Sequence, residues 1–298
     1  MKAIAPPATT ITRATQGVLL MTLAMLSIPF VDGLAKHLSA AYSPLFIGWA
    51  RYAVASVIVV PISAALQGRF AFPTERVSSH ILRTLFLVAA MTLYFLAIAR
   101  IPLATAASAF FVGPIVAVVL SVVMLGERMT IGKAIALALG AAGSVVILRP
   151  GGSTDPGMLL AFASGVLFAF YLIATRHAAQ ASAPLPTLAF QCVVGALLLT
   201  PQAVATWRLP AATDLWLFAG LGAFSAISHV LSIAAFRFSD ASTLAPLVYI
   251  ELIGAALIGY FAFGEVPGTS TVIGAMLIVA AGLVLVQQDQ AQRRLERK

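Results

Sequence analysis

Charged side chains are scarce in this sequence. Only 9% of its 298 residues are Asp, Glu, Lys or Arg, whereas a soluble domain carries about a quarter. So few charges cannot cover the surface of a water-soluble domain, and 61% of the residues are hydrophobic. We therefore expect an all-α integral membrane protein whose main surroundings are the lipid bilayer.

Several chemical signatures are missing as well. The single cysteine, Cys192, cannot form an intramolecular disulfide, and no metal-site spacing surrounds it. The sequence has neither a His-Glu-x-x-His motif nor a phosphate-binding glycine loop. Ser225 and Ser228 lie near His229, but without the glycine-flanked turn of a serine hydrolase. We expect no cofactor, no metal and no catalytic residue, and do not predict an enzyme.

Positive charge exceeds negative charge, with 18 Lys and Arg against 10 Asp and Glu. Lys and Arg collect in cytoplasmic loops of membrane proteins, and a basic tail can contact anionic lipid, so no nucleic-acid partner is needed. With the N-terminus inside, thirteen of these cations lie on the cytoplasmic side and five on the other, which sum to the 18 present. Both termini are therefore predicted to be cytoplasmic.

Ten apolar runs are long enough to cross a bilayer, which takes about 20 residues of helix. Each is bounded by proline, glycine or charge. The predicted spans cover residues 17–36, 45–66, 81–99, 104–125, 131–148, 157–175, 187–205, 215–236, 241–263 and 272–286. The connections are too short to hold a soluble domain.

The two halves of the chain resemble each other. Matching positions keep an offset of 137 to 140: Lys36 with Arg176, Pro44 with Pro184, Pro61 with Pro201, Glu127 with Glu265, and Gly143 with Gly282. Each half holds five spans, an odd number, so the second half enters the membrane from the opposite side. We predict two inverted five-helix repeats, 1–150 and 151–298, around a central cavity, the second with a short basic cytoplasmic tail. Such repeats are typical of alternating-access transporters, although duplication without transport would give the same pattern.

One set of motifs recurs over nearly the whole chain. It comprises Tyr94-Phe95-x-Ala97-x-x-Arg100-x-Pro102-x-Ala104, Pro114-Ile115, Leu125-Gly126-Glu127, Gly140 and Gly143, then Phe236, Ala241, Gly264-Glu265 and Gly282. This set resembles the drug/metabolite transporter (DMT) superfamily, EamA type, and within it the bacterial amino-acid exporters of the YddG type. The resemblance implies a secondary transporter of the bacterial inner membrane that exports aromatic and other amino acids or related small metabolites.

The alternatives to amino-acid export differ in what they would move or bind. A facilitator or channel would have the same lined pathway without coupling. An exporter for another metabolite or a drug would share the fold but not the substrate. A membrane receptor would bind a ligand without turnover. Protons are the candidate coupling ion for a secondary transporter.

Ionisable side chains inside the spans are the first candidates for a substrate cavity, because a charge within lipid is costly. Glu251 lies ten residues into its span, and we expect it to contact a substrate amine or to hold a proton. His229 is a candidate partner or proton relay. Asp32 stands one turn before Lys36, which suits either an ion pair or a substrate contact. Arg51 is long enough to reach the membrane interface, where we expect it.

Aromatic residues supply the remaining candidates for the cavity. They are Trp49, Tyr94, Phe110, Phe168, Tyr171 and Tyr249. The tyrosines are the more specific candidates, because a hydroxyl at depth needs a partner. The glycine-rich fifth and tenth spans are expected to pack closely as a scaffold away from the substrate.

Three prolines, Pro29, Pro114 and Pro246, lie inside predicted helical runs. Each removes a backbone hydrogen bond, so each is predicted to be a hinge or a packing kink. The position that matches Pro114 in the second half falls at Glu251 or the next residue, so the halves are not expected to present equivalent chemistry at the midplane. Glu127 and Glu265 end their spans in both halves, which indicates a structural role.

Overall fold

A computed structural model describes residues 13–68, 72–126, 129–148, 155–178, 183–235, 238 and 245–296 of the chain. These residues form helices and no strands. Eight helical segments are long and apolar enough to cross a membrane, and two shorter apolar helices, Leu247–Phe263 and Thr269–Val284, complete a set of ten. The predicted all-helical, ten-span fold is confirmed.

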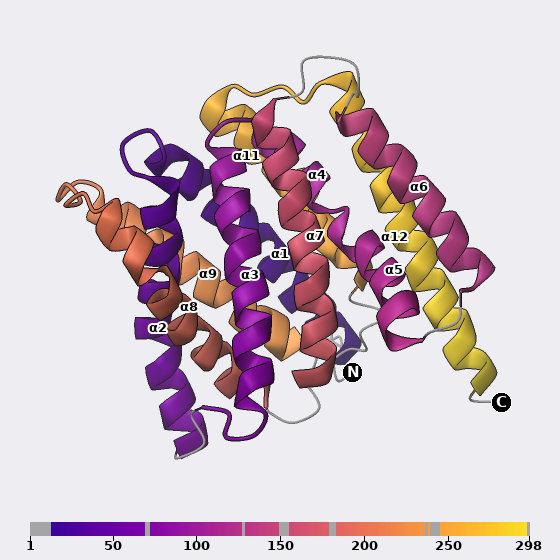
Figure 1. The fold of residues 1–298 in the computed structure, drawn as a ribbon, viewed down its shortest axis with the longest axis horizontal. Helices are drawn as coiled ribbons and strands as arrows, with labels where there is room; N and C mark the ends of the chain where they lie inside the picture. The colour runs from indigo at the N-terminus through magenta and orange to yellow at the C-terminus, as the bar shows by residue number, and fades with distance from the viewer. Residues whose placement is uncertain are drawn as a thin grey trace, which may run out of the picture.

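Each half of the chain contributes five spans (Figure 1). The first half contains α1 (Arg13–Leu38), α2 (Pro44–Gln67), α3 (Val77–Ile98), α4 (Leu103–Phe110), α5 (Gly113–Leu125) and α6 (Ile131–Leu148). The second half contains α7 (Pro156–Ala178), α8 (Pro184–Ala205), α9 (Leu215–Ala235), the 3-10 segment η2 (Ala245–Tyr249), α11 (Ile250–Phe263) and α12 (Thr269–Glu296). The segments α4 with α5, and η2 with α11, each make one broken span.

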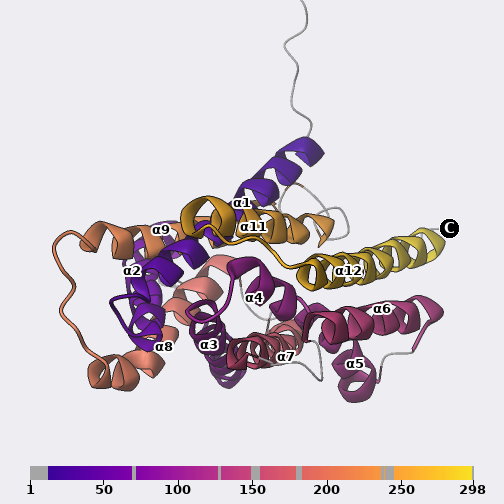
Figure 2. The same ribbon diagram turned by 90° about the horizontal axis from the view of Figure 1, so that it is seen from above.

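The two halves are interleaved. The most extensive packing joins α3 to α7, α1 to α9, α6 to α12 and α2 to α8, always one helix from each half. Exchanging the first five spans with the second five turns the pair α3–α7 into α9–α1, so the packing follows the repeat. In Figure 1, α1 and α7 run in opposite directions, and α1 begins at the end of the bundle where α12 finishes. Figure 2 shows α6 and α12 side by side at one edge.

The fourth span is broken where one helix was predicted over 104–125. α4 ends at Phe110, and α5 begins at Gly113 with Pro114 in its first turn. Inside a helix, Pro114 would lose its bond to the carbonyl of Phe110 and its ring would clash with that oxygen. At the start of a new helix neither cost arises. The ninth span, predicted over 241–263, likewise changes from 3-10 to α-helix at Ile250, three residues after the turn that holds Pro246. Pro29, by contrast, lies inside an unbroken α1.

Glycines permit the closest helix contacts. A Cβ added to Gly165 of α7 would lie 2.5 Å from the carbonyl oxygen of Phe110, where α4 ends. Between α6 and α12, a Cβ on Gly143 would lie 2.8 Å from the oxygen of Gly274, and one on Gly274 would lie 2.7 Å from that of Gly143. The close packing predicted for the fifth and tenth spans is therefore confirmed.

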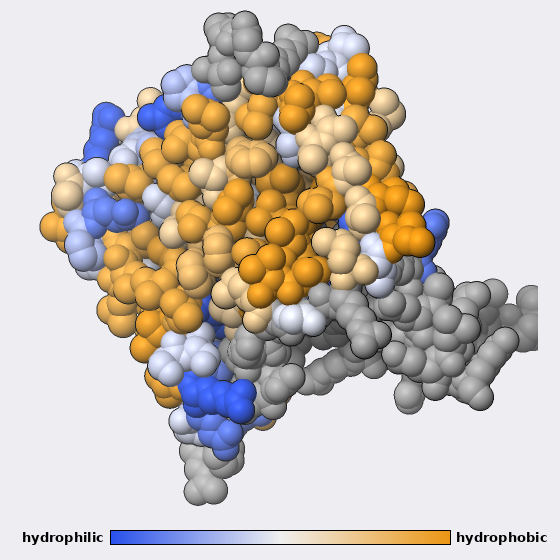
Figure 3. Space-filling model, turned by 45° about the vertical axis from the view of Figure 1, so that its right-hand side comes forward, coloured by the Kyte–Doolittle hydropathy of each residue, from blue (hydrophilic) through white to orange (hydrophobic). Residues whose placement is uncertain are grey.

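The outer surface is apolar over much of its area. Figure 3 shows hydrophobic residues across the middle of the molecule and hydrophilic residues toward its margins. Large apolar side chains stand fully out of the core, among them Val57, Val123 and Phe261, which are 75%, 75% and 79% exposed. Such a surface suits contact with lipid tails and not with water.

We expect Gly165→Ala to lower the free energy of unfolding by about 1–3 kcal/mol, because the new methyl group meets backbone that cannot turn away. Thermal unfolding of the purified protein in detergent measures this. The matched control is Gly268→Ala, where an added Cβ meets nothing within 4 Å. Equal melting temperatures for the two variants would contradict the close approach of α7 to the end of α4.

Candidate functional site

A cavity of about 180 Å³ lies between the two halves. Helices α1 to α4 line it from the first half, and α7, α9 and α11 line it from the second. Its polar and charged lining consists of Asp32, Arg51, Ser225, Ser228, His229 and Glu251, together with Tyr94 and Tyr171. Neither α6 nor α12 contributes to the lining, as expected for scaffold helices.

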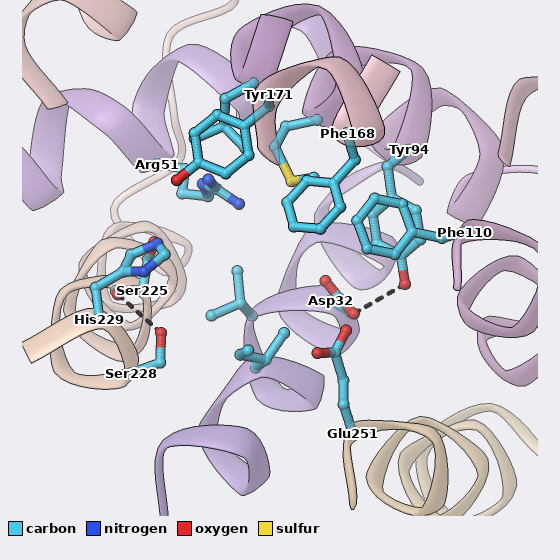
Figure 4. Close-up of a pocket in the computed structure, with 14 residues that line it drawn as sticks. Asp32, Arg51, Tyr94, Phe110, Phe168, Tyr171, Ser225, Ser228, His229 and Glu251 are labelled. Carbon is cyan, nitrogen blue, oxygen red and sulfur yellow. Dashed lines mark hydrogen bonds between the residues drawn. The ribbon is translucent and has the colours of Figure 1, made fainter. Parts of the chain in front are cut away.

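Two carboxylates form one wall of the cavity. Asp32 comes from α1 and Glu251 from the first turn of α11, and they are only 3% and 8% exposed. Figure 4 shows the two carboxylates directed toward each other. The hydroxyl of Tyr94 donates a hydrogen bond of 3.0 Å to Asp32 Oδ2. Within the described part of the chain, no hydrogen bond or ion pair reaches Glu251, so its carboxylate is available to a ligand.

Close packing of α1 on α11 brings these carboxylates together. Gly254, one turn after Glu251, receives the ring of Pro29, one turn before Asp32: a Cβ on this glycine would lie 2.5 Å from Pro29 Cγ. One turn further along α11 and α1, a Cβ on Gly33 would lie 2.7 Å from Ile258 Cγ2. The small residues let the helices approach, and the acidic side chains on either side of this contact then face the same space.

A cation stands across the cavity from the carboxylates. Arg51 of α2 is 8% exposed, and its guanidinium carbon lies 4.8 Å and 5.6 Å from the ring centroids of Tyr52 and Phe95. Figure 4 shows Arg51 and His229 on the side away from Asp32 and Glu251. The expectation that Arg51 reaches the membrane interface is therefore wrong, because packing of α2 against the second half turns the side chain inward.

Aromatic rings form a continuous third wall. The centroids of Tyr94 and Phe110 are 5.2 Å apart, those of Phe110 and Phe168 are 4.8 Å apart, and those of Phe168 and Tyr171 are 5.3 Å apart. Phe110 is the last residue of α4, so the break in the fourth span places its ring in this series. The wall offers flat apolar faces between the acidic and basic sides (Figure 4).

A second buried arginine lies behind the aromatic wall. Arg83 of α3 is 5% exposed and donates hydrogen bonds to Tyr171 Oη and Gln191 Oε1, both 2.9 Å, and to Thr175 Oγ1 at 3.2 Å. No carboxylate pairs with it among the described residues. Sequence reasoning assigned Arg83 to the cytoplasmic loop cations. Its place two residues inside the predicted span 81–99 was the signal that it is buried.

Two residues predicted for the cavity lie elsewhere. Tyr249 lines a separate apolar groove beside α4, α11 and α12, where its ring packs 5.5 Å from that of Phe111. Trp49 donates a hydrogen bond of 3.2 Å to Thr200 Oγ1. Each stands two residues before a residue that does line the cavity, Glu251 or Arg51. Two residues correspond to about 200° of helical rotation, so such neighbours face opposite ways. His229, the expected partner of Glu251, lines the cavity on its far side.

Lys36 pairs with Glu265 and not with Asp32. Its Nζ lies 2.6 Å from Glu265 Oε1 and donates a hydrogen bond of 2.6 Å to the carbonyl of Ile101. Glu265 Oε2 accepts a hydrogen bond of 2.9 Å from the amide of Leu103. These contacts join α1, the start of α4 and the α11–α12 loop at one end of the bundle, here termed the Lys36 end. The structural role predicted for Glu265 is confirmed, whereas Glu127 lies outside the described residues.

Comparison with known proteins gives a consistent set of relatives. The model of the EamA-like transporter family matches residues 15–149 and again residues 155–287. An S-adenosylmethionine uptake transporter of Rickettsia prowazekii is 27% identical, over 92% of this chain and 93% of that one. A riboflavin transporter of Vibrio cholerae is 25% identical, over 95% and 96%. A pseudopaline exporter of Pseudomonas aeruginosa is 27% identical, over 90% and 95%.

A solved crystal structure shares the fold. It aligns with a TM-score of 0.65 at 21% identity and covers 94% of this chain and 98% of its own. Because so much of both chains aligns, the likeness extends to the whole ten-span arrangement. At this identity it carries information on the fold alone.

We expect Lys36→Met and Glu265→Gln each to lower the melting temperature, because each leaves the other's charge without its partner. The double variant should lose less stability than the two single variants together, by about 1 kcal/mol, since the ion pair is removed only once. Thermal unfolding of the four proteins in detergent measures this difference. Lys36→Met combined with Asp214→Asn is the matched control and should be additive, because Asp214 accepts its hydrogen bond from Tyr42. Additive losses for Lys36 and Glu265 would contradict the coupling.

Proposed function

Because this chain belongs to the EamA-like transporter family, we propose that it carries amino acids, or metabolites with an amino-acid head group, across the bacterial inner membrane by alternating access. Membership makes it a multi-pass membrane transporter of small metabolites. The head-group specificity is our proposal and rests on the chemistry of the central cavity. The name of the Rickettsia relative, an S-adenosylmethionine uptake transporter, agrees with it, since that metabolite is itself an α-amino acid.

The separation of charge across the cavity is the observation that carries the proposal. Asp32 and Glu251 form one wall, and Arg51 faces them from the other. An α-amino acid has an ammonium and a carboxylate on one carbon, and each must meet an opposite charge when it leaves water for a buried site. We assign the ammonium to the two carboxylates and the carboxylate to the guanidinium, whose planar fork suits two parallel hydrogen bonds.

The aromatic wall suits the rest of the substrate. Phe110, Phe168 and Tyr171 offer ring faces next to the charged groups. An aromatic or apolar side chain would gain by leaving water there, and a cationic group would be attracted to a ring face. The wall therefore favours large or aromatic amino acids and S-adenosylmethionine over small polar ones.

Alternating access requires the Lys36 end to open, because contacts there join the two halves. Besides Lys36 with Glu265, the hydroxyl of Tyr42 donates to Asp214 Oδ2 at 2.6 Å, and Arg208 donates to the carbonyl of Ala41 at 2.7 Å. In an inverted repeat, the same rocking motion that breaks contacts at one end forms contacts at the other. With both termini in the cytoplasm, as the distribution of Lys and Arg favours, the Lys36 end faces the periplasm.

Transport by the purified protein in liposomes tests this function. We expect uptake and efflux of labelled phenylalanine, methionine and S-adenosylmethionine above empty liposomes, and little transport of phenethylamine, which lacks the carboxylate. Measuring both directions matters because the relatives include an uptake transporter and an exporter by name.

We expect Arg51→Gln to reduce phenylalanine uptake by about tenfold or more, which corresponds to the loss of a hydrogen bond to a charged group. The matched control is Arg208→Gln, which removes an exposed arginine outside the cavity. Wild-type protein that moves phenethylamine as well as phenylalanine, or Arg51→Gln with unchanged uptake, would contradict recognition of an amino-acid head group.

A further inference from the structure

We propose that Asp32 and Glu251 form a proton-exchange site, which gives up one proton when it binds a substrate with one net positive charge. This inference rests on the proposed function and concerns the same cavity. It names the coupling ion and the charge of the substrate that the ion replaces. The protein would then act as a proton antiporter for cationic amino-acid metabolites.

The surroundings of the two carboxylates contain too little positive charge to balance both. From α3, the Tyr94 hydroxyl donates to Asp32. From α2 and α9, Arg51 and His229 face the pair across the cavity. The lining from α4 and α7 next to the pair is aromatic, with Phe110 and Phe168.

The nearest lysine is not available to the carboxylates. Lys36 lies one turn beyond Asp32 on α1, but its ammonium is held by Glu265 and by the carbonyl of Ile101. Glu251 is directed into the cavity with no hydrogen bond from any described residue, and it is more than nine-tenths buried. A proton or a substrate cation is therefore the partner that its position calls for.

The charges of the lining set the exchange ratio. Two ionised carboxylates and one guanidinium sum to −1 when His229 is counted as neutral. One proton shared by Asp32 and Glu251 brings this sum to zero, as two facing carboxyl groups commonly hold one proton between them. A substrate with a net charge of +1 also brings it to zero, with both carboxylates ionised. The cavity is thus neutral with either occupant, and net charge within the bilayer is avoided.

The exchange itself breaks no bond of the substrate. The O–H bond of the carboxyl group breaks, its electron pair stays on the oxygen, and the proton passes to the aqueous phase. A cationic group of the substrate then takes the place of that proton beside the two carboxylates. A substrate without net charge, such as a simple zwitterion, leaves the shared proton where it is, so its movement is not coupled to protons.

A matched pair of ligands separates these cases. S-adenosylmethionine carries an ammonium, a sulfonium and a carboxylate, and its net charge is +1. S-adenosylhomocysteine lacks the sulfonium methyl group and is a neutral zwitterion of nearly the same shape. We expect the full-length protein, in weakly buffered detergent solution with a pH indicator, to release about one proton for each S-adenosylmethionine bound and none for S-adenosylhomocysteine.

Variants assign the released proton to the pair. We expect Glu251→Gln and Asp32→Asn each to abolish proton release, and an imposed pH gradient to lose its effect on S-adenosylmethionine uptake into liposomes. Exchange of labelled for unlabelled S-adenosylmethionine, which needs no gradient, should persist in at least one of them. Glu75→Gln removes an exposed carboxylate and is the matched control, with release as in the wild type.

The outcomes distinguish this inference from the proposed function. Wild-type protein that binds S-adenosylmethionine without releasing a proton overturns the inference and leaves the amino-acid carrier intact. Proton release that continues in both variants overturns it as well, because the proton then comes from another group. Binding of neither ligand, with phenylalanine also unbound, overturns the proposed function itself. Release with S-adenosylmethionine alone, lost in both variants, supports the inference.

Discussion

A charged group in the interior of a bilayer is stable only where another polar or charged group meets it, and the arrangement of this protein follows from that constraint. The buried charges do not face lipid. Asp32, Arg51 and Glu251 converge on one cavity between the two halves, and Arg83 lies just behind its aromatic wall among neutral hydrogen-bond acceptors. The outer surface is left to apolar side chains. Substrate chemistry can therefore occur only at the junction between the repeats.

Backbone polarity obeys the same constraint as side-chain charge. A helix satisfies its own amide and carbonyl groups, so a break inside the membrane must lie against protein or a cavity. The break between α4 and α5 lies against Gly165 of α7, and Phe110 at its edge turns its ring into the cavity. Pro114 explains why the helix stops at that point, and the small residue on α7 explains why the stopped helix can be buried.

The fold is symmetric, but the chemistry of the cavity is not. By the offsets of the repeat, Asp32 corresponds to Leu172, Arg51 to Gln191 and Glu251 to Pro114, so each charged residue has an uncharged counterpart. The repeat supplies two similar bodies that can rock against each other. The differences between them supply one acidic wall and one basic wall, which a single asymmetric substrate can recognise.

The sequence by itself determined the fold of this protein. Scarce charge, long apolar runs and ordered matches between the halves predict ten spans in two inverted repeats, because each of these features depends on local composition or on counting. It also marked Asp32, Glu251, His229 and four of the aromatic residues as candidates, since ionisable groups and tyrosines stand out in apolar helices.

Only the tertiary structure decided which way each helix faces. Asp32 meets Tyr94, 62 residues away, and not Lys36 on its own helix; Lys36 meets Glu265 instead. Arg51 turns into the cavity, while Trp49 and Tyr249 turn away from it. In a soluble helix an apolar stripe indicates the buried face, but a helix that is apolar on all sides has no such stripe. Its rotation about its own axis is set by close packing against helices of the other half, and those contacts do not exist until the chain has folded.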